Sequence, residues 1–231
     1  MPKNDPFTPW KLSPSDLTFL WDECPRCFYL KVVHGFNRPA SPMPKIFTRI
    51  DKLMKDFFEG QPTVHISESL PEGQVRFGEK WVTSQPISFS QLAGNCYLRG
   101  KFDTALEFAD GTYGIVDFKT SEPRPEHIPF YSRQLHAYAF ALENPAGGGF
   151  YLKPISRLGL LCVEPVQMRR ASSGQLAYMG DVTWLECPRD DTWFLGFIDG
   201  ILRVLANPQP PPASENCSYC QYRQDARQRG I

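Results

Sequence analysis

The sequence predicts an α/β protein in which a central mixed β-sheet is flanked by helices. Three observations lead to this class. Segment 45–59 spaces its apolar residues with the period of an amphipathic helix, strand-like runs follow at 80–89, 96–109 and 112–120, and a further helical pattern occupies 126–144. After this core come two more strand-like segments and a last apolar helix that ends before a proline-rich tail.

Composition and charge limit the possible partners. The chain has 231 residues, enough for one core with a small appendage, and its 25 basic side chains equal its 25 acidic ones. No overall electric field therefore attracts nucleic acid or membrane, and a basic binding surface must be local. The opening MPKNDPFTPW lacks an apolar signal region, so we expect a cytoplasmic protein without membrane association.

One acid in the first helical segments, Asp51, has two possible orientations. Serine and aspartate capping signals open a helical pattern at 13–33. In segment 45–59, Asp51 falls at the edge of the apolar arc, and it either reaches water as a boundary acid or points toward the sheet. The other charged residues are expected on the opposite side of this helix: Arg49, Lys52, Lys55, Asp56 and Glu59.

The strand-like runs at 96–109 and 112–120 meet at Asp110-Gly111, which is a hairpin signal. A two-residue loop would pair Asp103 with Phe118 and place an acid beside a core aromatic. A three-residue loop at 109–111 with Gly111 left-handed instead pairs Asp103 with Asp117, and Phe102 with Phe118. Phe102 then shares the buried face with Thr104, Leu106, Phe108, Val116 and Phe118.

The polar face of this hairpin indicates a metal site. Asp117 and Lys119 point to the same side of their strand, an arrangement that also fits an ordinary half-exposed strand. Asp103 facing Asp117 is a repulsive pair, which a hard divalent cation such as Mg²⁺ or Mn²⁺ relieves. Asp51 would approach this site from its helix. Gln134 and Tyr138, four residues apart on the next helix, follow the hairpin directly.

The seven cysteines do not suggest a disulfide framework in a chain expected to be cytoplasmic. Three of them, Cys96, Cys162 and Cys187, are isolated and expected in the core. The other four form two CxxC pairs, Cys24 with Cys27 and Cys217 with Cys220. We expect a main domain at 1–206 and, at 207–231, a proline-rich connector that returns the second pair to the first. Four such thiols suit Zn²⁺ or an iron-sulfur cluster, or they are unrelated.

The series GKFD, VDFKT and QLHAY resembles the PD-(D/E)XK nuclease superfamily, specifically the RecB-like branch of CRISPR-associated and recombination exonucleases. The resemblance implies a restriction-endonuclease-like core and metal-dependent cleavage of DNA. It makes Asp103 and Asp117 metal ligands, Lys119 the catalytic lysine, and Gln134 and Tyr138 the pair that closes the site. Where the branch usually has a helical histidine, this chain offers Asp51.

The resemblance also bears on the cysteines. Several RecB-like nucleases carry a [4Fe-4S] cluster on one N-terminal and three C-terminal cysteines. Cys24, Cys217 and Cys220 match three of these ligands, but the last one is expected near Ala226. Cys27 would have to take its place, which leaves Zn²⁺ as a competitor.

Two functions follow as expectations. The first is a metal-dependent deoxyribonuclease that acts on DNA ends or single strands in repair, recombination or defence, with a helicase or another repair or defence protein as a further partner. The second is a catalytically silent DNA-binding or assembly subunit with the same fold. Five bases are candidates for contacts with the DNA backbone: Arg26, Lys31, Arg223, Arg227 and Arg229.

Overall fold

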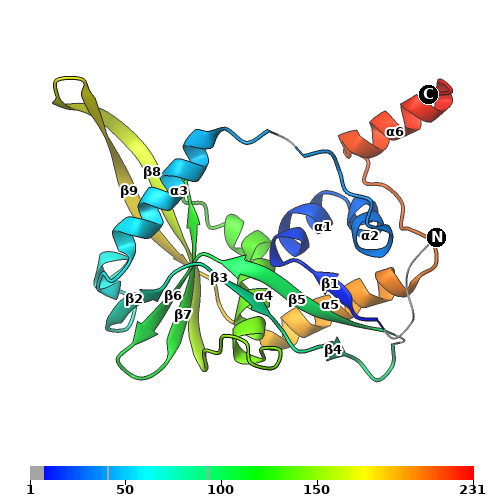
Figure 1. Cartoon of the computed structure of the whole chain (residues 1–231), viewed down its shortest axis with the longest axis horizontal. Helices are drawn as coiled ribbons and strands as arrows, with labels where there is room; N and C mark the ends of the chain where they lie inside the picture. Colours follow the sequence, from blue (N-terminus) through cyan, green and yellow to red (C-terminus); the bar gives the residue numbers. More distant parts are fainter. Residues whose placement is uncertain (1–7, 41, 93) are drawn as a thin grey trace.

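The computed structural model describes residues 8–40, 42–92 and 94–231, and it has the α/β architecture expected from the sequence (Figure 1). Within these residues the strands form two sheets. The five-stranded sheet runs in the order β2 (Gly73–Phe77), β6 (Thr104–Phe108), β7 (Tyr113–Lys119), β8 (Ile155–Ser172) and β9 (Gln175–Glu186). The other sheet has β5 (Asn95–Phe102) beside β1 (Trp10–Leu12), β3 (Lys80–Thr83) and β4 (Ile87–Ser88).

Both sheets are mixed. In the five-stranded sheet, β7 and β8 are parallel and the other neighbours are antiparallel. Helix α4 (His127–Glu143) lies between β7 and β8 in the sequence and makes the long connection that a parallel pair requires. In the second sheet, β1 is parallel to β5, whereas β3 and β4 are antiparallel to it.

The helices cover the five-stranded sheet on both faces. Helices α4, α2 (Pro25–His34) and α5 (Asp191–Ala206) enclose the larger core, which includes Ile115 and Leu160 from the sheet. Helix α3 (Lys45–Phe58) packs on the other face, where Met54 and Phe58 meet Val116 and Phe118. The rings of Phe58 and Phe118 lie 5.8 Å apart. Because α3 and α4 lie on opposite faces, side chains from the two helices can meet only where the sheet ends or divides.

The hairpin has the expected register. Thr104 pairs with Val116, and the loop at 109–111 contains Gly111 with φ of 81°. The expected continuous strand, however, breaks at Asp103: β5 ends before it in one sheet, and β6 begins after it in the other. Phe102 consequently packs in the larger core, against Tyr138 and Phe150, and does not share the face of Leu106 as expected.

The two ends of the chain meet beside α2. The expected helix at 13–33 is a π-helical turn (Asp16–Leu20) and α1 (Trp21–Glu23), followed after Cys24 by α2. Cys24 itself is extended, with φ of −162°, and caps α2. The proline-rich connector after α5 leads to α6 (Ser218–Gln228), which lies above α2 in Figure 1.

Two further features complete the fold. The strands β8 and β9 extend past the sheet as a long hairpin arm, whose outer residues are largely exposed (Figure 1). No helix in the described ranges combines the length and the apolar character needed to cross a bilayer.

Candidate active site and cysteine centre

Asp117 is a buried acid near the end of β7, on the face that α4 covers. It is 4 % exposed, and the amide Nε2 of Gln134 donates to its Oδ1 at 2.7 Å. Its Oδ2 forms an ion pair with Lys119. Burial raises the pKa of Asp117 to about 6, although the ammonium of Lys119 opposes this shift. Gln134 therefore fixes the orientation of a carboxylate that water does not solvate.

Lys119 lies beside Asp117 because residues two apart on a strand face the same side. Its ammonium also lies over the ring of Tyr131, 4.4 Å from the centroid. Burial lowers the pKa of Lys119, but the carboxylate of Asp117 outweighs burial and raises the pKa above its ordinary value. Lys119 is therefore a protonated, positively charged group next to the acid.

Tyr138 fixes α4 to the neighbouring sheet. Its hydroxyl donates to the backbone carbonyl of Lys101 at 2.8 Å, in β5 two residues before Asp103. Burial raises the pKa of Tyr138, so the hydroxyl keeps its proton and remains a donor. Gln134 and Tyr138 thus hold the two halves of the site, Asp117 on β7 and the end of β5, against one helix.

Asp103 occupies the point where the two sheets divide. The backbone N–H of Phe118 donates to its Oδ2 at 3.1 Å, which holds Asp103 beside the strand that carries Asp117. Its Oδ1 lies 2.8 Å from Nζ of Lys55, a residue of α3. Asp103 and Asp117 are thus neighbours across the hairpin, and each already contacts a lysine.

Lys55 does not lie on the solvent side of α3, opposite the apolar arc, where the helical period predicted it. Its side chain is only 14 % exposed, and Nζ lies 2.7 Å from Asp51 Oδ2 and 2.7 Å from Glu79 Oε1 as well as near Asp103. Asp51 and Asp103 therefore both contact the ammonium of Lys55, which lies between them. Glu79, in the short link between β2 and β3, carries no sequence signal and was not anticipated.

The carboxylates are suitable ligands for a hard divalent cation. Oδ2 of Asp117 is buried and, apart from its ion pair with Lys119, has no partner among the described residues, so it retains a lone pair for a cation. In the described ranges, however, the acids do not form a compact set: only the four cysteines bring three or more potential ligand atoms within 4.8 Å of one another. Metal binding by Asp51, Asp103 and Asp117 stays a prediction.

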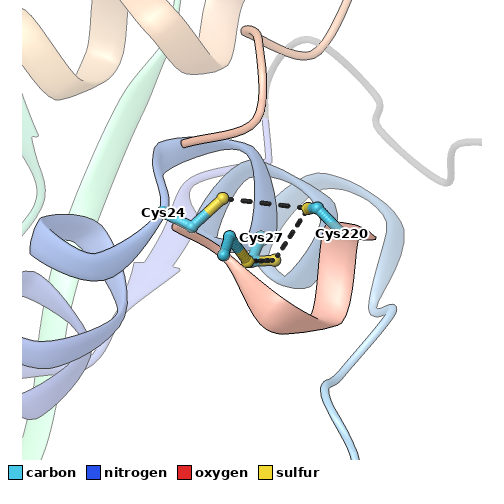
Figure 2. A group of neighbouring side chains, drawn as sticks. Cys24, Cys27 and Cys220 are labelled. Atoms are coloured by element: carbon cyan, nitrogen blue, oxygen red, sulfur yellow. Dashed lines mark hydrogen bonds between the residues drawn. The ribbon is translucent and has the colours of Figure 1, made fainter. Parts of the chain in front are cut away.

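The four paired cysteines come together where the chain ends meet. Cys24 and Cys27 lie at the start of α2, and Cys217 and Cys220 at the start of α6. Figure 2 shows Cys24, Cys27 and Cys220 directed toward one another. The other three cysteines, Cys96, Cys162 and Cys187, are buried as expected.

The spacing of the sulfurs fits a single metal ion. The Sγ atom of Cys27 lies 3.7 Å from that of Cys217 and 3.6 Å from that of Cys220, and the Cys24 and Cys220 sulfurs are 3.9 Å apart. Four thiolates around one tetrahedral Zn²⁺, with bonds of about 2.3 Å, are about 3.8 Å apart. In a four-iron cluster each thiolate binds a different iron, which requires wider spacing.

A cation lies beside this centre. Nη2 of Arg38 donates to Sγ of Cys217 at 3.2 Å, and Nη1 pairs with Glu23 at 2.6 Å. Burial raises the pKa of Cys24, but hydrogen bonds from the backbone of Ser214 and Cys27 outweigh burial and lower that pKa to about 6. The lowered pKa favours a thiolate at Cys24, the form that binds metal, whereas burial raises the pKa values of Cys27 and Cys220.

The candidate DNA-contacting bases are only partly together. Arg26, Arg223 and Arg227 line a cavity of about 490 Å³ beside α6, whereas Lys31 pairs with Asp16 at 2.7 Å. A second group of bases, not anticipated as a unit, lies along α3 and comprises Lys45, Arg49 and Lys52, with acids such as Asp56 and Glu59 beside Lys52.

The fold and the acid–lysine hairpin define a protein of the nuclease class. A family model described as the PD-(D/E)XK nuclease superfamily matches residues 63–224, and the chain belongs to this superfamily. Its mixed sheets flanked by helices are a restriction-endonuclease-like fold. A structure described as the crystal structure of SSO0001 is similar, with a TM-score of 0.50 and 14% identity, covering 93% of this chain and 84% of that chain. A search of curated proteins found no match.

Proposed function

We propose that the protein is a divalent-metal-dependent deoxyribonuclease of the RecB-like branch, which hydrolyses phosphodiester bonds at DNA ends or in single strands. One observation carries the proposal: a buried Asp117 is oriented by Gln134, paired with Lys119 and adjacent to Asp103. Repair, recombination or defence are the expected settings, with a helicase or another repair or defence protein as the expected partner. The division into a nuclease domain at 1–206 and a connector at 207–231 belongs to the same proposal.

The residues have distinct roles in this reaction. Asp103 and Asp117 would hold Mg²⁺ or Mn²⁺, with Asp51 as a third acid, and the ion would polarise the scissile phosphate and lower the pKa of a water. Lys119 places a positive charge where negative charge develops on the phosphate. Gln134 is a positioning residue for Asp117, and Tyr138 is a positioning residue that keeps α4 against β5.

The approach of nucleic acid along α3 is part of the proposal. A cavity of about 390 Å³ next to the site is lined by Lys52, Lys55 and Lys101 among others, and a second of about 540 Å³ is lined by Lys45, Arg49 and Lys52. Both share Lys52, so the basic side chains form a track along α3, although the first cavity is also lined by the acids Asp51, Asp56, Glu59 and Glu79. Such a track attracts a phosphate backbone through counterion release.

A second candidate function is a silent DNA-binding or assembly subunit. The observation that favours it is the ammonium of Lys55, which contacts Asp103 on the side that a metal would use. If Lys55 never leaves Asp103, the hairpin acids cannot form a cation site.

A nuclease assay with matched variants tests the proposal. Labelled single-stranded DNA, duplex DNA and RNA are incubated with Mg²⁺, Mn²⁺ or EDTA, and binding is measured in parallel by fluorescence anisotropy. We expect metal-dependent DNA cleavage that is lost in Asp117→Ala and in Lys119→Ala, with DNA affinity largely kept. Glu107→Ala removes an acid of the same hairpin that pairs with Arg76, and should cleave normally.

The outcomes separate the two candidate functions. DNA binding without cleavage under any metal condition supports the silent subunit, whereas cleavage that survives in Lys119→Ala contradicts the role given to this lysine. Cleavage of RNA but not DNA contradicts the choice of substrate.

For the cysteine centre we propose one Zn²⁺ bound by Cys24, Cys27, Cys217 and Cys220, with a [4Fe-4S] cluster as the competitor. The close sulfur spacing favours the single ion. Protein purified without oxygen should be colourless and contain about one zinc per chain by elemental analysis. A brown protein with iron and sulfide contradicts zinc and supports the cluster.

A further inference from the structure

Lys55 holds three carboxylates together at the edge of the candidate site. Its Nζ lies 2.7 Å from Asp51, 2.7 Å from Glu79 and 2.8 Å from Asp103, although the side chain comes from the helix on the far face of the sheet. Lys55 reaches Asp103 because β5 and β6 separate at that residue. An ammonium group therefore lies between Asp51 and Asp103, two of the three acids that, with Asp117, were predicted to hold a metal ion.

Lys55 changes the net charge of the candidate metal site. Four carboxylates (Asp51, Glu79, Asp103 and Asp117) and three ammonium groups (Lys55, Lys101 and Lys119) leave one net negative charge. Without Lys55 the same cluster would carry two. Lys55 therefore reduces the attraction for a divalent cation, and it also covers an oxygen of Asp103 that such a cation would use.

The surroundings of Lys55 offer its ammonium another partner. Lys55 lines the cavity of about 390 Å³ together with Lys52, Lys101 and Thr104. The same cavity is also lined by four carboxylates, those of Asp51, Asp56, Glu59 and Glu79, so a backbone phosphate would have to approach through the three lysines, where it could accept hydrogen bonds from Lys55 in place of Asp103. Moving the ammonium from Asp103 to a phosphate needs a rotation of the flexible lysine side chain and no backbone movement.

We infer that Lys55 competes with the divalent cation for Asp103, and that a nucleic-acid phosphate draws Lys55 away, so that nucleic acid and metal bind cooperatively. This inference rests on the proposed nuclease function. By linkage, nucleic acid raises metal affinity by the same factor by which metal raises nucleic-acid affinity. A metal ion is then held firmly only when substrate is present.

Mn²⁺ binding provides a test that does not depend on cleavage. Its affinity is measured by electron paramagnetic resonance for the wild type and Lys55→Met, each with and without a single-stranded DNA oligonucleotide whose phosphorothioate linkages resist hydrolysis. Lys52→Met is the matched control, because Lys52 lines the same cavity and its loss removes the same charge from the same helix. Lys55→Gln is a second variant in case Lys55→Met does not fold.

We expect Lys55→Met to bind Mn²⁺ on the order of tenfold more tightly than the wild type without DNA, and more tightly than Lys52→Met. The oligonucleotide should raise Mn²⁺ affinity by a similar factor in the wild type and by much less in Lys55→Met and Lys55→Gln. The inference is wrong, while the nuclease proposal stands, if Lys55→Met gains no more Mn²⁺ affinity than Lys52→Met. It is also wrong if the oligonucleotide raises Mn²⁺ affinity equally in the wild type and in Lys55→Met. If no protein binds Mn²⁺ at all, both fail.

Discussion

Nη2 of Arg38 lies 3.2 Å from Sγ of Cys217, so a guanidinium group donates a hydrogen bond directly to one of the four clustered sulfurs. The same guanidinium lies over the ring of Tyr219, 4.6 Å from its centroid, and pairs with Glu23. Arg38 is therefore held in place from three sides. A fixed positive charge beside four thiolates lowers the energy of the metal-bound, negatively charged centre.

From this contact we predict that Arg38→Gln weakens metal binding by about 10-fold to 100-fold, the usual cost of losing such an outer partner. Zn²⁺ affinity is measured by competition with a chelator, and the thiolate-to-cobalt absorption of the Co²⁺ form reports on the sulfurs. Arg227→Gln, an exposed arginine on α6, is the control. Equal Zn²⁺ affinities in all three proteins would show that the Arg38 contact has no influence on the centre.

The second prediction concerns the stability that the centre provides. Metal binding closes a loop from α2 to α6 through nearly the whole chain, and α6 buries none of its own residues fully, so its attachment depends strongly on the cysteines. A zinc chelator should lower the melting temperature of the wild type and of Cys162→Ser. It should change Cys217→Ser little, because that variant has already lost the centre. A chelator effect of the same size in Cys217→Ser would rule out a structural role for Cys217.

The third prediction concerns Gln134, whose amide is a hydrogen-bond donor to the buried carboxylate of Asp117. A hydrogen bond to a charged group contributes about 1.5 to 3 kcal/mol, so Gln134→Leu should reduce kcat by about 10-fold to 100-fold. KM should change little, because Gln134 orients Asp117 and is not assigned to DNA binding. Gln175→Leu, on the exposed arm, is the control. A changed KM with normal kcat would assign Gln134 to substrate binding.

The fourth prediction is a pH effect on stability at His136, which is buried in α4. Its Nε2 accepts the backbone N–H of Asp190 at 2.8 Å, and its Nδ1 lies 2.8 Å from the carbonyl oxygen of Ser132, so the ring is neutral with its proton on Nδ1. Burial lowers the pKa of His136. The unfolded chain therefore binds a proton near pH 6.5 before the folded chain does, and acidification favours unfolding.

Urea unfolding at pH 7.5 and pH 5.5 measures this effect. The wild type should lose more unfolding free energy on acidification than His136→Gln does, by at most about 1.4 kcal/mol over this pH range. His65→Gln, an exposed histidine variant, should follow the wild type. Parallel losses in the wild type and His136→Gln would mean that His136 does not titrate on unfolding.

The sequence predicted what local patterns determine. The hairpin register follows from Asp110-Gly111 and from the rule that acids and core aromatics avoid one face, and the structure confirms it. The extent of α3 follows from its apolar period and differs by one residue from the expected segment. The convergence of the two cysteine pairs was likewise predicted, because their spacing is typical of a shared site.

The features that the sequence did not predict depend on contacts between segments that are distant along the chain. Nothing local to Asp103 indicates that the strands before and after it join different sheets, yet this break moves Phe102 into the other core and opens the path for Lys55. Helical periodicity placed Lys55 on the solvent side because it could not identify where the apolar arc of α3 meets the end of a sheet. Glu79 sits in a short link without a motif, and only the approach of Lys55 and Lys101 gives it a role.

The inner and outer parts of β8 should differ in how easily their hydrogen bonds open, because only the outer part belongs to the projecting hairpin arm. From Gly159 to Cys162, β8 is paired on both sides, with β7 and β9, but beyond Cys162 it is paired only with β9. A bulge between Pro165 and Gln167 lies just outside this boundary. The outer amides should therefore exchange with deuterium through small fluctuations, and the inner ones only through much larger openings. The arm can bend or adapt to a contact while β7, which carries Asp117 and Lys119, keeps its geometry.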